Sequence, residues 1–168
     1  MPRHLIAPFA ALAIAACSPA ADEPEPEAEA SATPAAGGMA GSPIELTPLT
    51  PQDVADADLK GELGCSFTAE NGDMLLLAMG NVADAKGHAL GLAKRADAPQ
   101  LLTSTEAGGY DPLPDGTSFT GSDMSYEVAL TSTTAAGEGE SPPFPAELRL
   151  NRQDGAMLTI PGRWTCGP

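Results

Sequence analysis

From residue 62 onward, the sequence is a succession of short segments in which apolar and polar residues alternate. The clearest alternation places Met124, Tyr126, Val128 and Leu130 at every second position. Because successive side chains of a strand point to opposite faces, this period of two is typical of a half-buried β-strand. We therefore expect the larger part of the chain to be built from strands.

Turn-forming residues separate these segments. Asn71-Gly72-Asp73 and Asp154-Gly155 are hairpin signals, Pro161-Gly162 predicts a further turn, and residues 107–116 and 134–145 have the composition of loops. We expect strands at 63–67, 74–79, 88–94, 101–102, 118–121, 124–130, 146–151, 156–160 and 163–166. Eight or nine short strands at roughly ten-residue spacing predict a mostly β fold of about eight strands, either a small antiparallel barrel or a sandwich.

One short helix is expected at the start of this region. Thr50 suits the N-cap, Pro51 suits the first helical position, and Asp53 lies in the first turn. Gly61 ends the helix, which we place at about 51–58.

The N-terminus has the pattern of an export signal. Arg3 and His4 precede the apolar run 5–14, which small residues follow. A charged start, an apolar segment of this length and small residues at its end describe a secretory signal peptide. The run is too short to span a membrane, which takes about 20 apolar residues.

The end of that signal resembles the bacterial lipobox. Ile14-Ala15-Ala16-Cys17 provides an aliphatic residue, two small residues and a cysteine. The resemblance implies that residues 1–16 are a signal peptide and that an acylated Cys17 anchors the mature chain in a membrane. Because Ser rather than Asp follows, it also implies a place in the outer membrane, facing the periplasm.

Residues 17–47 combine the lipidated cysteine with an acidic segment rich in Pro and Ala, and they contain no aromatic residue, Lys or Arg. Such a segment cannot bury enough apolar surface to offset its ordering entropy, so we expect a disordered tether. The remaining residues, 48–168, are expected to form one β-rich globular domain.

The cysteines divide into two roles. The chain has three, and the lipobox assigns Cys17 to lipid. Cys65 and Cys166 are then expected to form a disulfide that joins the first strand to the last. Trp164, two residues before Cys166, is expected to cover this disulfide inside the core.

The net charge limits the partners. The formal charge is −15, and removal of residues 1–16 takes away Arg3 but no acid, which leaves −16. Such a chain repels phosphate backbones, so nucleic acid is excluded as a partner. A cationic protein or an envelope glycan is compatible with this charge.

The sequence offers little for catalysis. His88 is the one histidine after residue 16, and no nucleophile, nucleotide or metal-binding motif is present. The acids Glu138 and Glu140 lie in a Gly-rich loop, and Asp111 to Gly116 matches an EF-hand only in part. We therefore assign no catalytic residue, cofactor or metal. Tyr110, between Gly109 and Asp111, is the candidate binding-surface aromatic.

Three functional hypotheses remain. The first is a non-enzymatic binding or structural lipoprotein of the envelope. The second is a lysozyme-inhibitor-like lipoprotein, because Ser122-Asp123-Met124-Ser125-Tyr126 resembles the Ser-Gly-x-x-Tyr stretch of those inhibitors, although Asp123 stands at the Gly position. The third is a hydrolase that uses carboxylates. The lack of catalytic motifs favours the first.

Overall fold

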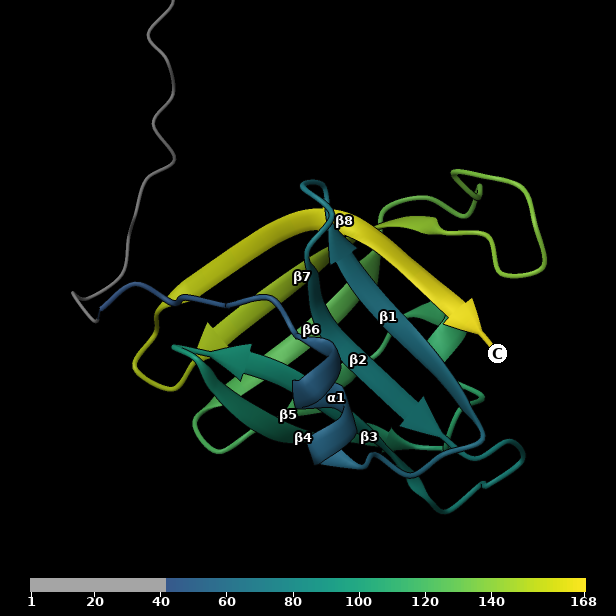
Figure 1. The fold of residues 1–168 in the computed structure, drawn as a ribbon, viewed down its shortest axis with the longest axis horizontal. Coiled ribbons are helices and arrows are strands. Elements are labelled where there is room, and N and C mark those ends of the chain that lie inside the picture. The colour runs from purple at the N-terminus through teal and green to yellow at the C-terminus, as the bar shows by residue number, and fades with distance from the viewer. Residues whose placement is uncertain (1–41) are drawn as a thin grey trace, which may run out of the picture. The chain divides into compact units, whose positions relative to one another are not determined.

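The computed structural model describes residues 42–168, which form a closed eight-stranded antiparallel β-barrel with one short α-helix (Figure 1). The strands follow one another around the barrel in sequence order, and β1 pairs with β8. The predicted mostly β fold is confirmed, and of its two forms the chain adopts the barrel. The elements are α1 (Pro51–Ala57), β1 (Leu63–Ala69), β2 (Met74–Gly80), β3 (His88–Arg95), β4 (Ala98–Ala107), the 3₁₀ turn η1 (Leu113–Asp115), β5 (Ser118–Thr120), β6 (Met124–Leu130), β7 (Phe144–Arg152) and β8 (Met157–Gly167).

The predicted signal peptide, the predicted lipidation site Cys17 and the tether up to residue 41 lie outside the described residues. Within residues 42–168, no helix combines the length and the apolar character that crossing a bilayer requires.

The interior of the barrel is a packed core. An eight-stranded barrel is just wide enough for side chains to fill it, and alternate residues of each strand point inward. The largest buried side chains of this core, each at most 2% exposed, are Phe67, Leu76, Leu102, Leu113, Phe119, Tyr126, Leu148, Leu150 and Trp164.

The two ends of the barrel differ. At one end, here called the turn end, tight connections join β1 to β2, β3 to β4, β5 to β6 and β7 to β8. At the other, here called the loop end, the longer connections 81–87, 108–117 and 131–143 gather together with the end of β8. In Figure 1 the β6–β7 loop and the C-terminus lie on the right and the β7–β8 turn on the left.

Residues 42–50, here called the strap, close the turn end. Ile44 is 8% exposed and belongs to the core cluster. The backbone N–H of Thr47 donates to the Lys94 carbonyl on β3 at 2.9 Å, and that of Leu49 donates to the Met74 carbonyl on β2 at 2.8 Å. The direct pairing of β2 with β3 does not extend beyond Leu76 and Ala93 at this end. The strap therefore joins the two strands where they no longer pair with each other. The folded domain therefore begins before the predicted boundary at residue 48.

Helix α1 follows the strap and is fixed by its N-terminus. Thr50 and Asp53 form a capping box, in which the Asp53 backbone N–H donates to Thr50 Oγ1 at 3.2 Å. Hydrogen bonds from the Thr50 hydroxyl and backbone N–H, followed by one from Lys94 at 3.0 Å, lower the pKa of Asp53 to about 2. Asp53 thus ties the start of the helix to β3 by an ion pair.

One predicted turn is wrong. Pro161-Gly162 does not reverse the chain, because β8 runs without interruption from Met157 to Gly167 and arcs over the barrel (Figure 1, yellow). At Gly162 the strand pairs with both β7 and β1. A Cβ at Gly162 would lie 2.4 Å from the Thr68 carbonyl oxygen. The glycine therefore permits the close approach of β1 as β8 changes partner.

Candidate binding site at the loop end

The loop end carries an excess of acidic side chains. We count its connections 58–62, 81–87, 108–117 and 131–143, which hold seven acidic residues and two basic ones. The acidic residues are Asp58, Glu62, Asp84, Asp111, Asp115, Glu138 and Glu140, and the basic ones are Lys60 and Lys86. Loops held by a rigid scaffold are the usual place for binding residues, so this end is the candidate site.

The ion pairs of the domain lie mainly elsewhere. Arg95 pairs with Asp123 and Arg152 with Asp154 at the turn end, each at 2.8 Å. These Arg hydrogen bonds lower the pKa of both carboxylates. In the loops of the loop end, among the residues described, ion pairing is confined to Lys60 with Asp58, both exposed. The negative charge of the loop end is thus largely uncompensated by nearby bases.

Three of these carboxylates are positioned by backbone N–H groups of the β2–β3 loop. Glu62 Oε2 accepts from Val82 at 3.0 Å, and Asp84 Oδ1 accepts from Gly87 at 2.8 Å. Asp111 Oδ1 accepts from Ala83 at 3.3 Å. These three hydrogen bonds fix the β2–β3 loop to the connections that carry Glu62 and Asp111, and Asp84 closes the loop on itself. They also hold the three carboxylates in place.

A groove crosses the outer face of β1, β2 and β8 at this end. Its volume is about 310 Å³. Two cross-strand rows form its floor: Met79, Gly64 and Gly167 in one, and Leu77, Ser66 and Thr165 in the other. Glu62 and Ser141 also line it.

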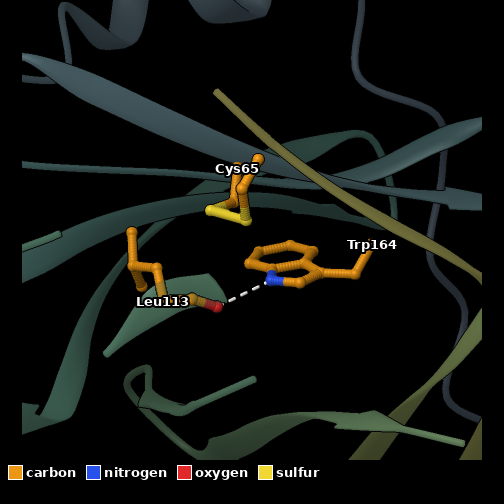
Figure 2. The surroundings of a disulfide bond; sticks show 4 residues. Cys65, Leu113 and Trp164 are labelled. Atoms are coloured by element: carbon orange, nitrogen blue, oxygen red, sulfur yellow. Dashed lines mark hydrogen bonds between the residues drawn. A yellow bond between two sulfur atoms is a disulfide. The ribbon is translucent and has the colours of Figure 1, made fainter. Parts of the chain in front are cut away.

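The disulfide lies directly beneath this groove. Cys65 and Cys166 are bonded and are opposite one another on β1 and β8, as predicted. Figure 2 shows the Trp164 indole packed below the disulfide, and this side chain is fully buried. Its Nε1–H donates to the Leu113 carbonyl at 2.7 Å. The prediction that Trp164 covers the disulfide is confirmed. Through its hydrogen bond to Leu113 of η1, Trp164 also holds the β4–β5 loop.

Tyr110, the predicted binding-surface aromatic, lies at the loop end but is half-buried. It packs against the core cluster, and its backbone N–H donates to the Asn81 carbonyl at 3.0 Å. A Cβ at Gly80 would lie 2.5 Å from the Tyr110 nitrogen, so this glycine permits the contact. The residue thus helps to seat the β4–β5 loop on β2.

The residues considered for catalysis are dispersed. His88 begins β3, and its Nδ1 lies 2.8 Å from the Ser104 carbonyl oxygen. Glu138 and Glu140 are exposed in the β6–β7 loop. No group of three metal-ligating side chains occurs within residues 42–168.

The stretch that resembles a lysozyme inhibitor lies at the opposite end. Ser122 and Asp123 form the β5–β6 turn, and Asp123 is engaged by Arg95. Tyr126 is 2% exposed, and burial raises the pKa of its hydroxyl. An aromatic ring held in the barrel core is not presented to an enzyme cleft.

Comparison with known proteins adds no relative: no protein-family model matches the sequence, and no curated protein or solved structure gives a significant match.

The groove over the disulfide was not predicted from the sequence. The signal that could have found it is Gly64 and Gly167, one next to each cysteine, but their facing each other depends on the pairing of β1 with β8.

Proposed function

We propose that this chain is a lipid-anchored lipoprotein of the bacterial cell envelope, held through Cys17 in the outer membrane on its periplasmic side. Its barrel serves as a non-enzymatic binding module for a cationic protein. The observation that carries the binding proposal is the collection of acidic side chains on the long loops of one end, where few bases neutralise them. An envelope glycan is the other partner compatible with the charge.

The barrel interior supports a surface-binding role. Large side chains fill it, so a partner meets the outer wall and the loops.

The anchor is tested by replacing the cysteine. Cys17→Ser is expected to abolish incorporation of a palmitate analogue, because the hydroxyl cannot form the thioether that carries the lipid. Metabolic labelling followed by gel fluorescence measures this, with Ser18→Ala as a control that keeps the label. Label retained on Cys17→Ser would refute the assignment.

The partner is tested by cross-linking the anchored protein in its own envelope and recovering it at low and high salt. The expected result is one reproducible partner whose recovery falls when salt is raised. Raising ionic strength from 0.1 M to 1 M shortens the Debye length from about 10 Å to about 3 Å, which screens the acidic loops from a cationic surface.

Two matched triple variants sharpen that experiment. Asp115→Asn, Glu138→Gln and Glu140→Gln remove three charges from the loop end. Glu45→Gln, Glu70→Gln and Asp97→Asn remove three from the turn end. All six side chains are exposed, so neither set should disturb the fold. Recovery should fall several-fold with the first set alone, since steering acts on the surface that meets the partner. Equal loss with both sets, or no salt-sensitive partner, would contradict the proposal.

A further inference from the structure

The groove over the disulfide is open because its floor has small side chains. Gly64 and Gly167 face each other across β1 and β8, next to the bonded cysteines. Ser141 of the β6–β7 loop rests on Gly167, where a Cβ would lie 1.9 Å from the serine oxygen. The loop therefore forms one wall of the groove, and any side chain at position 167 would displace it.

The chemistry of the groove is mixed. Leu77 and Met79, both half-buried, provide an apolar strip on the β2 side. Glu62 provides a carboxylate at the rim, fixed by the Val82 N–H at 3.0 Å, and it is in no ion pair among the described residues. Lys and Arg side chains bury their methylene stems along apolar surface and keep their charge in water. An apolar strip that leads to a fixed carboxylate therefore suits both parts of such a side chain, the apolar stem and the charged end.

The size of the groove agrees with a side chain as occupant. Pockets that enclose small molecules have volumes of roughly 300–1,000 Å³ and bury most of the ligand. This groove, at about 310 Å³, is an open depression on the outer wall. It can seat one or two side chains of a partner that also contacts the surrounding acidic loops.

We propose that this groove seats a lysine or arginine side chain of the cationic partner, with its stem over Leu77 and Met79 and its charge against Glu62. This inference rests on the proposed function and makes its contact point specific.

The test uses the full mature chain, residues 17–168, titrated with an octalysine peptide at low ionic strength and followed by amide NMR. Glu62→Gln removes the charge but keeps an oxygen acceptor for Val82. Ser66→Tyr fills the floor from an outward position between Leu77 and Thr165. The controls are Glu70→Gln in the β1–β2 turn and Thr159→Tyr on the outer face of β8, both away from the groove.

Each groove variant is expected to raise the Kd for octalysine at least about three-fold, an effect within the range that one surface charge contact can have. Each control variant is expected to leave the Kd within about 1.5-fold of the parent value. Amide shifts should concentrate on 62–66, 77–79 and 165–167. Equal effects of all four variants, shifts spread over both ends or no binding would overturn the inference. Salt-sensitive recovery of an envelope partner would still support the proposed function in that case, so the two can fail separately.

Discussion

Replacing Trp164 by alanine is expected to lower the free energy of unfolding by about 3–5 kcal/mol, the usual range for removing a large buried aromatic side chain. The indole is fully buried next to the disulfide, at a point where β8 pairs with both β1 and β7. Its loss leaves a cavity and removes one of the two donors to the Leu113 carbonyl, which keeps only the hydrogen bond from the Gly116 N–H. Urea unfolding followed by far-UV circular dichroism measures the change, since the variant lacks the sole tryptophan.

Two further variants separate the contributions. Trp164→Phe keeps most of the apolar volume but cannot donate to Leu113, so it should lose less than the alanine variant. Because the Leu113 carbonyl still accepts from the Gly116 N–H, losing the indole hydrogen bond should cost about 0.5–1.5 kcal/mol. Met157→Ala, at a side chain that is 73% exposed, should be nearly neutral. A Trp164→Ala variant within about 1 kcal/mol of the parent would show that the indole does not organise the core.

Removing the disulfide should have an effect of similar size. Cys65 and Cys166 are 101 residues apart, and closing a loop of about that length removes unfolded-state entropy worth about 4–5 kcal/mol. The double variant Cys65→Ala, Cys166→Ala is therefore expected to unfold at much lower urea concentration. Because domains of this size are stable by only about 5–15 kcal/mol, we expect the disulfide and Trp164 changes combined to leave little folded protein.

The control for this prediction is the state of the thiols. Denatured without reductant, the parent protein should show no alkylation of Cys65 or Cys166, and after reduction both should react. Quantitative alkylation without reductant would refute the pairing. A double variant as stable as the parent would show instead that barrel closure does not depend on the covalent link.

The sequence predicted best those elements that local rules decide. The strict alternation from Met124 to Leu130 predicted β6 with its observed bounds, and the Thr50-Pro51 start placed α1 to within one residue at its end. Both follow from rules that act within a few residues, namely the two-residue period of a strand and the hydrogen bonds of a helix N-cap. The two cysteines also indicated which strands meet.

Elements that depend on distant partners were not predictable in this way. From Leu101 and Leu102 only a short strand was expected, yet β4 runs from Ala98 to Ala107, because β3 pairs with it from Ala98 to Thr103 and again at Ala107. Pro161-Gly162 has turn chemistry, but pairing with β7 and β1 keeps it extended. The acidic loops of the candidate site were visible in the sequence, whereas their gathering at one end follows from the closure of the barrel.

The disulfide makes the barrel a covalent ring from residue 65 to residue 166. The long loops at 81–87, 108–117 and 131–143 all lie inside this ring. A protease that nicks any one of them leaves the two pieces joined through the cysteines. The strap and α1 stay continuous with the piece that begins before Cys65, so a nicked barrel is not separated from the N-terminal segment. Exposed loops can thus be cut while the barrel stays covalently joined to the chain that precedes Cys65.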